Sequence, residues 1–118
     1  MTINTTISLL DDMRPNAAAA ETKAAWTIAL DGRLRTEVLG VPARPLSYPE
    51  DADAELTAAA PYGELYALWC AAQLDLASGE TARYANSMAA FEKLLDAFRR
   101  QSAKDYAFAS EGFRNVRL

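Results

Sequence analysis

Residues 61–104 contain two apolar patterns with helical spacing, one on each side of Gly79, and the rest of the chain must pack against them. Apolar side chains that recur every three or four residues lie on one stripe of an α-helix. Glycine closes a helix because it adopts left-handed backbone angles without steric cost, and Glu80 suits the start of the next helix. The pattern therefore predicts an antiparallel helical hairpin. Its two stripes are Leu65, Leu68, Trp69, Ala72 and Leu76 before the turn, and Tyr84, Met88, Phe91, Leu94, Leu95 and Phe98 after it.

A short helix is predicted ahead of the hairpin, over residues 5–13. Its apolar residues have helical spacing, and Asn4, Thr5 or Thr6 supplies the N-cap side chain that accepts from the first backbone N–H groups. The helix must end before Pro15, because proline disfavours helical angles at the preceding residue.

A second helix is predicted over residues 17–39, and it ends at Gly40. Gly32 lies inside it and costs about 1 kcal/mol relative to alanine, so this glycine marks a close helix crossing or a bend. Residues 40–60 then hold prolines at a density that forbids a continuous helix. We expect an ordered connection there, with a short extended piece near residues 56–58.

The side chains that most catalytic and metal sites need are scarce in this chain. Histidine is absent, which leaves zinc sites, Cys-His catalysis and Ser-His-Asp catalysis without their parts. Cys70 is the only cysteine, so no internal disulfide can form, and its place in an apolar helical run predicts a buried side chain. We expect no enzymatic activity and no cofactor.

The carboxylates are interpreted as solvated surface groups. In the acidic run of the connection, a calcium loop starting at Asp51 would need glycine where Leu56 stands and a bidentate glutamate where Tyr62 stands. Glu92 and Asp96 share one face of the predicted helix, but basic residues follow them closely along the chain. We therefore expect no metal site.

The composition favours one all-α domain. Of the 118 residues 51% are hydrophobic, many of them alanine, and only 9% are aromatic, which is typical of closely packed helices. No apolar run reaches the ~20 residues of a transmembrane helix, and the N-terminal segment is acidic where a signal peptide is basic and apolar. We expect a protein that is made in the cytoplasm and has no membrane partner.

The charge of the chain is uneven along its length. Residues 1–98 carry 7 basic and 14 acidic side chains, whereas residues 99–118 carry 5 basic and 2 acidic ones. A cationic end suits an acidic partner or phosphates. The alternative is that these cations only complement the C-terminus of a solvated helix.

The periodicity is lost after residue 101, and Gly112 is expected to break any helix there. We therefore predict a helical domain over residues 1–101 and a C-terminal extension over residues 102–118 that has no core of its own. Such an extension needs another surface for its aromatic residues. The alternative is a frayed end whose aromatic side chains fold back onto the domain.

Five short sequences carry a resemblance to a known family: RPN at residues 14–16, ETKAAW at 21–26, LDGRL at 30–34, PYGELY at 61–66 and AQLDLASGETARYANSMAAF at 72–91. The chain resembles the small head-tail connector, or adaptor, proteins encoded in the structural-gene clusters of tailed phages and prophages. The likeness covers most of residues 14–98. The connection over residues 41–60 matches no pattern of that family.

The resemblance implies an all-helical virion protein that assembles into a homo-oligomeric ring of twelve copies in the phage neck. Such a ring sits beneath the portal protein, at the vertex through which DNA enters and leaves the capsid. Members of the family engage the portal through a C-terminal extension and present their other face to a stopper or tail completion protein. Acidic side chains of the body would then line the channel and repel phosphates, so that genomic DNA slides through without sequence-specific binding.

The candidate portal contacts are the cationic and aromatic residues of the C-terminal segment: Arg99, Arg100, Tyr106, Phe108, Phe113, Arg114 and Arg117. An alternative function is that of a small helical peptide- or protein-binding module of a bacterial regulator. Such a module would hold an amphipathic peptide in an apolar groove between its helices.

Overall fold

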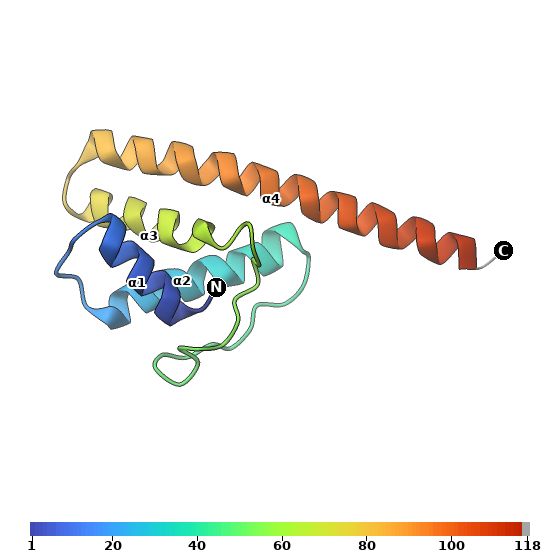
Figure 1. Ribbon diagram of the computed structural model, residues 1–118, viewed down its shortest axis with the longest axis horizontal. Coiled ribbons are helices and arrows are strands. Elements are labelled where there is room, and N and C mark those ends of the chain that lie inside the picture. Colours follow the sequence, from blue (N-terminus) through green and yellow to red (C-terminus); the bar gives the residue numbers. More distant parts are fainter. Residues whose placement is uncertain (117–118) are drawn as a thin grey trace.

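The chain folds into a layered bundle of helices (Figure 1). The structure is a computed structural model that describes the backbone of residues 1–116 and the side chains of residues 1–107. Within residues 1–116 there is no strand, and the predicted all-α fold is confirmed. α3 lies between α4 on one side and the pair of α1 and α2 on the other. The elements are α1 (Ile3–Met13), α2 (Ala20–Arg33), the π-helix η1 (Leu34–Val38), α3 (Glu64–Ala77) and α4 (Thr81–Val116).

The predicted hairpin is formed by α3 and α4, and it turns at Gly79. This glycine has a φ of 70°, in the left-handed region, and the N–H of Glu80 donates to the carbonyl of Asp75 at 2.9 Å. The side chain of Asp75 in turn accepts a hydrogen bond from Ser87 of α4 at 2.8 Å. Backbone and side-chain bonds together therefore set the geometry of the hairpin.

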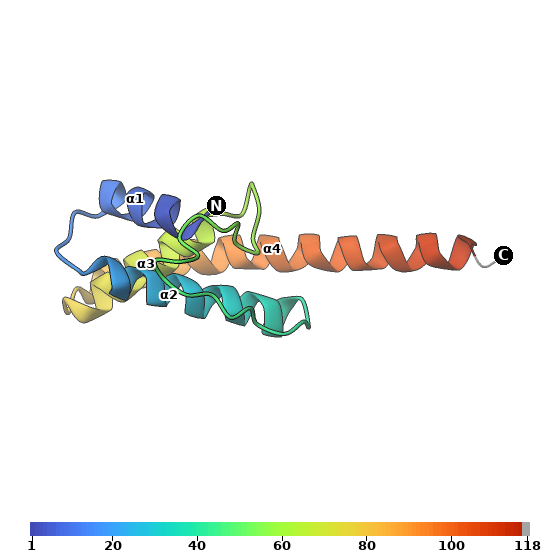
Figure 2. The same cartoon turned by 90° about the horizontal axis from the view of Figure 1, so that it is seen from below.

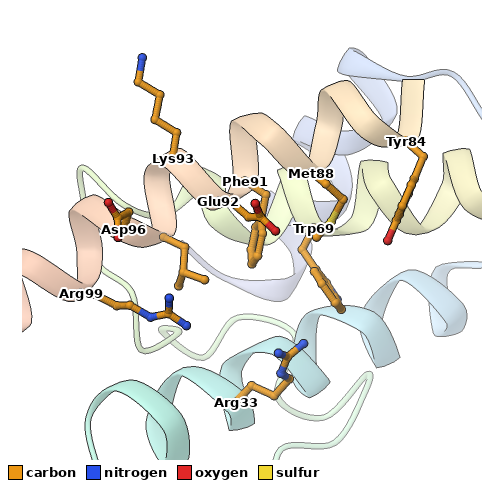
Figure 3. Close-up of a pocket in the computed structure, with 10 residues that line it drawn as sticks. Arg33, Trp69, Tyr84, Met88, Phe91, Glu92, Lys93, Asp96 and Arg99 are labelled. Carbon is orange, nitrogen blue, oxygen red and sulfur yellow. The ribbon is translucent and has the colours of Figure 1, made fainter. Parts of the chain in front are cut away.

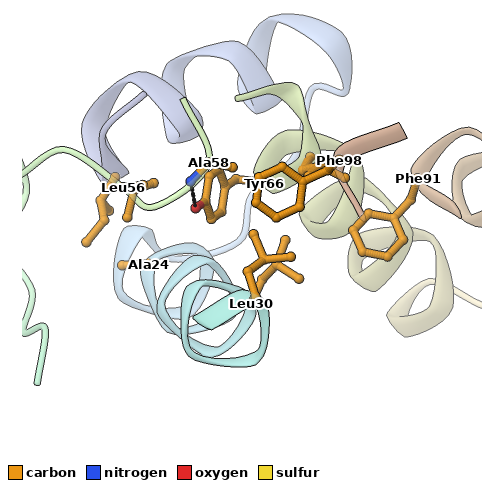
Figure 4. Close-up of a cluster of buried hydrophobic side chains, with 10 residues drawn as sticks. Ala24, Leu30, Leu56, Ala58, Tyr66, Phe91 and Phe98 are labelled. Atoms are coloured by element: carbon orange, nitrogen blue, oxygen red, sulfur yellow. Dashed lines mark hydrogen bonds between the residues drawn. The ribbon is translucent and has the colours of Figure 1, made fainter. Parts of the chain in front are cut away.

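The main core lies where the three layers meet (Figure 4). Phe91 packs on Trp69 with ring centroids 5.3 Å apart, and Phe98 meets Tyr62 edge-on at 5.5 Å. Leu76 departs from the predicted stripe, since it lies in the last turn of α3 and is 56% exposed. The buried members of the core are Ile3, Ala24, Leu30, Leu34, Leu56, Ala58, Leu65, Tyr66, Phe91 and Phe98.

α1 starts earlier than predicted. Its N-cap is Thr2, whose side chain accepts from the N–H of Thr5 at 3.1 Å, while the Thr5 hydroxyl accepts from the N–H of Thr2 at 2.8 Å. The prediction of a cap at residues 4–6 is wrong, because the fully buried Ile3 belongs to the helix. The helix ends at Met13, before Pro15, as predicted.

α2 and η1 together occupy the region of the second predicted helix. α2 begins three residues later than predicted, and the last turn is a π-helix, after which Gly40 takes a φ of 67°. A Cβ added at Gly32 would lie 3.4 Å from the Cβ of Ala43. The close neighbour of this glycine is therefore the connection between η1 and α3. Of the two alternatives, the helix crossing is wrong, and the bend stays a prediction.

The connection between η1 and α3 is held by a buried carboxylate on α2. Asp31 is 1% exposed, and its Oδ1 accepts from the hydroxyl of Tyr66 and from the N–H of Thr57, both at 2.8 Å. Its Oδ2 accepts from Arg44 at 3.2 Å. The Tyr66 hydroxyl also accepts from the N–H of Ala58 at 2.9 Å (Figure 4). One side chain of α2 thus fixes two points of the connection and one of α3.

Cys70 is fully buried, as predicted, and faces Thr27 of α2 with a Sγ–Oγ1 distance of 3.5 Å. Burial raises the pKa of its thiol to about 11, so the unreactive neutral form prevails at pH 8. We expect a thiol reagent at pH 8 to modify native protein at least ~100-fold more slowly than urea-unfolded protein. Equal rates in the two states would contradict this placement of Cys70.

Candidate functional site

α4 is longer than the rest of the bundle and projects beyond it as a single helix (Figures 1 and 2). Its 36 residues correspond to about 54 Å at a rise of 1.5 Å per residue, and the longest dimension of the molecule is 59 Å. Among the described side chains, Phe98 is the last that is buried, and residues 103–107 are all exposed. Residues 103–116 are termed the α4 arm.

The predicted partner-binding residues follow one another along this end of α4. Arg99, Arg100 and Tyr106 are exposed, and Tyr106 keeps 79% of its surface accessible. Arg100 donates to Asp96, one helical turn earlier, at 2.8 Å. The remaining four predictions fall outside the described side chains: the backbone is helical at Phe108, Phe113 and Arg114, and Arg117 lies beyond the described residues.

The helix passes through the region where the sequence predicts an extension. The predicted boundary between residues 101 and 102 lies inside α4, and the expectation that Gly112 breaks the helix is wrong, because α4 continues to Val116. Glycine weakens a helix by about 1 kcal/mol relative to alanine, yet it keeps the backbone N–H that the hydrogen-bond ladder needs. The arm is therefore a continuation of a core helix.

Two hollows lie along α4 on the side that faces α2 and η1, and Figure 3 shows the first of them. α2 and α4 both pack on α3 and barely meet each other, which leaves the space between them open. A hollow of about 650 Å³ lies over Trp69, and a second of about 510 Å³ lies between η1 and the start of the arm. They are separated where Leu34 and Val38 approach Leu95 and Arg99, since the space left there is only about 10 Å³. The two hollows together are termed the α4 groove. Along α4 its wall includes Tyr84, Met88, Leu95, Arg99, Ser102 and Tyr106.

Charges of both signs border the α4 groove. On the α2 side, the guanidinium of Arg33 lies over the Trp69 ring at 5.3 Å and pairs with Glu37 at 3.5 Å. On the α4 side, Glu92 and Asp96 precede Arg99. An apolar floor with charged borders is suited to bind an amphipathic helix.

The sequence gives only one indication of this groove. It places Tyr84, Met88 and Leu95 on the stripe that closes the hairpin, but the structure leaves all three half-buried, because the stripe is wider than α3 can cover. Past the last buried residue, the same face of α4 continues through Arg99 and Ser102 to Tyr106, although the apolar pattern itself is lost there. A stripe that outlasts its partner helix indicates an additional packing surface.

Residues from the resemblance sequences hold the layers of the bundle together. Arg14, from RPN, donates to Asp75 of the long sequence at 2.7 Å, and Asp75 is 3% exposed. The buried bond between Asp31 and Tyr66 joins LDGRL to PYGELY. Each of these contacts links two helices or a loop and a helix.

A third contact of this kind lies at the start of α2. Lys23, from ETKAAW, is 5% exposed and donates to Asn16, from RPN, at 3.2 Å and to Asp11 at 2.8 Å. The hydrogen bonds from Lys23 and Asn16 lower the pKa of Asp11. Six residues of the five sequences thus take part in contacts that position the helices.

Comparison of the chain with protein-family models, with curated proteins and with solved structures finds no match. None of the helices in the described part of the chain combines the length and the apolar character needed to cross a lipid bilayer.

Proposed function

We propose that this protein is a structural component of the virion neck of a tailed phage. In this proposal, copies of the chain form a ring, twelve in number, that joins the portal vertex to the stopper or tail completion protein and lets DNA pass. The observation that carries the proposal is the α4 arm, a helix that leaves the body with Tyr106 79% exposed and with Arg99 and Arg100 exposed just before its start. The sequence supports the proposal through the five sequences that resemble the connector family, and residues of these sequences form buried polar contacts between helices.

The arm has the properties of a docking element for the portal. It is helical and continues directly from the core helix beyond Phe98, which lowers the entropy lost on ordering it when it binds. Arg99, Arg100 and Lys104 give its base a positive charge, whereas residues 1–98 are strongly acidic. In the ring, acidic side chains of the body would face the channel and keep DNA mobile by repelling its phosphates.

Deleting residues 102–118 tests this proposal. We expect the truncated protein to keep its helical circular dichroism and its cooperative unfolding, because every buried side chain that the structure describes precedes residue 102. We expect it to lose co-sedimentation with portal rings of the same phage. Truncated protein that still binds the portal normally would overturn the assignment of the arm.

A double variant and its control distinguish a specific contribution of the arm from an effect of the overall charge of α4. Arg100→Ala combined with Tyr106→Ala should weaken portal binding by at least about tenfold, since aromatic and arginine residues dominate binding energy at interfaces. Arg83→Ala is the matched control, because Arg83 is an exposed arginine at the opposite end of the same helix. A loss of binding in the Arg83 variant would indicate a general charge effect.

The second candidate is a peptide-binding module of a bacterial regulator, and the observation that favours it is the α4 groove. It predicts that a bound amphipathic helical peptide covers the half-buried groove residues and leaves the arm exposed to solvent. The genes next to this one discriminate between the two candidates. Genes for a portal, a terminase and a capsid protein support the neck, and their absence favours the module.

A further inference from the structure

The hollow over Trp69 has two arginine side chains at one end, and they come from opposite walls. Arg33 belongs to the last turn of α2 and Arg99 to α4, and both also border the gap of about 10 Å³ that closes the hollow against η1. Figure 3 shows both guanidinium groups extending into the space between α2 and α4. The closed end of this hollow therefore carries two positively charged groups.

Most hydrogen-bond donors of these two groups are not used by the protein. A guanidinium has five N–H donors. Among the described side chains, Arg33 forms one bond, to Glu37 at 3.5 Å, and Arg99 forms none. The pair of Arg33 and Glu37 is exposed, with 52% and 53% of the two side chains accessible, so it contributes little to stability. Two guanidinium groups with free donors favour an anion that bridges them.

The other charged residues of the hollow do not neutralise its closed end. Asp96 is paired with Arg100 at 2.8 Å. Glu92 lies two helical turns before Arg99, which corresponds to about 10 Å along the axis of α4. Lys93 points away from α2 (Figure 3). The unbalanced charge at the closed end is therefore positive.

Next to the arginines the hollow is apolar and elongated. Its lining includes Trp69 and Met88, and the guanidinium carbon of Arg33 lies 5.3 Å from the centre of the Trp69 ring. A guanidinium held on a ring face keeps the N–H groups at its edge available to a carboxylate. From Tyr84 to Arg99 the hollow follows α4 for about 22 Å, the length of a helix of about 15 residues. An element of this length, rather than a small molecule, would fill it.

We propose that the hollow over Trp69 binds an acidic amphipathic helix of a partner protein. A carboxylate of that helix pairs with Arg33 and Arg99 at the closed end, and its apolar side chains cover Trp69 and Met88. Charge complementarity selects an acidic helix over a basic one. The inference rests on the peptide-binding candidate, for which it names the class of partner. It does not rest on the neck function, because the lining of this hollow includes no residue of the α4 arm.

A small carboxylate tests the anion site at the closed end. 3-Phenylpropionate carries a carboxylate beside an apolar ring, and 3-phenylpropionamide is its neutral counterpart. We expect the carboxylate to shift the NMR signals of Trp69 with a dissociation constant on the order of 1–10 mM, as is usual for a ligand of this size. The amide should bind at least about tenfold more weakly. Equal binding of the two, or no saturable shift with the carboxylate, would overturn the proposal.

Substitutions of the arginines test where the carboxylate binds. Arg33→Gln and Arg99→Gln should each weaken the binding of 3-phenylpropionate at least about fivefold, because each removes charge-assisted donors. Glu37→Gln should bind at least as tightly as the unchanged protein, since it frees Arg33 from a competing carboxylate. Arg83→Gln is the control and should change nothing, because Arg83 is exposed on α4 and does not line this hollow. Circular dichroism verifies folding. If both arginine variants bind like the unchanged protein, the site is misplaced.

A longer probe distinguishes a partner helix from a small ligand. It is a peptide of about 15 residues with leucine at every third or fourth position and two glutamates beside this stripe at one end. We expect it to bind at least about tenfold more tightly than 3-phenylpropionate, because it covers the whole hollow, and to lose at least about tenfold when both glutamates are replaced by glutamine. A peptide that binds no more tightly than the small carboxylate would overturn the partner helix.

The arm deletion separates this proposal from the neck function. Protein without residues 102–118 should bind the peptide as the full chain does, because every residue that lines the hollow precedes residue 102. The same deletion is expected to abolish portal binding. Loss of peptide binding on deletion would mean that the peptide binds the arm, and it would overturn the site over Trp69 while leaving the neck function standing.

Discussion

Replacing Asp31 by alanine is expected to lower the free energy of unfolding by about 3–5 kcal/mol, because it removes one partner of a buried ion pair. The Asp31 carboxylate is 1% exposed and accepts from Tyr66, Arg44 and the N–H of Thr57. Without it, these three donors lose a partner inside the protein. Within the described part of the chain, the Nε of Arg44 and the Oγ1 of Thr57 are already buried without a hydrogen-bond partner, so the cluster depends on the remaining bonds to Asp31.

Urea unfolding followed by circular dichroism measures this loss. Glu37→Ala is the control, since Glu37 forms an exposed pair with Arg33 and its removal should cost no more than about 0.5 kcal/mol. Tyr66→Phe removes only the hydroxyl that bonds to Asp31 and Ala58, and it should cost about 1–3 kcal/mol. This milder variant keeps the test measurable if the alanine variant is unfolded. If Asp31→Ala costs no more than Glu37→Ala, the cluster does not hold the connection in place.

Replacing Phe98 by alanine is expected to cost about 3–5 kcal/mol, the usual range for a buried phenylalanine. Phe98 is 7% exposed and packs edge-on against Tyr62 at 5.5 Å. It is the last buried contact of α4 before the arm, so its removal leaves a cavity at the root of the arm. Urea unfolding again measures the effect.

Tyr106→Ala is the matched control for Phe98→Ala, because it removes an aromatic ring from the same helix eight residues later. Tyr106 is 79% exposed, so its loss should change stability by no more than about 0.5 kcal/mol. A cost at Tyr106 as large as at Phe98 would mean that the arm packs on its own body. The contrast between the two residues therefore locates the point at which the core ends.

The helical elements were predictable because they depend on local spacing. The stripe on each side of Gly79 and the position of Pro15 predict a helical hairpin and the end of a short first helix, and both are confirmed. Cys70 is buried as its apolar surroundings indicate. Local signals were weaker at helix starts: the cap of α1 is Thr2 and not one of the three polar residues after Ile3.

The partners of the buried charges were not predictable, because they come from distant parts of the chain. Arg14 meets Asp75, and Asp31 meets Tyr66 and Arg44. No spacing rule connects residues in different helices, since their distance depends on how the layers pack. The same is true of the α4 groove, which exists because α2 and α4 both pack on α3 but leave a gap.

What the sequence by itself determined is therefore the set of helices, the hairpin turn and the uneven charge, since each is a property of neighbouring residues. Only the tertiary structure decided that α4 continues through Gly112 as a projecting arm and that its stripe remains half covered. The physical reason is that burial depends on the lengths of the packed helices. α3 is 14 residues long and α4 is 36, so α3 can cover only the first part of α4.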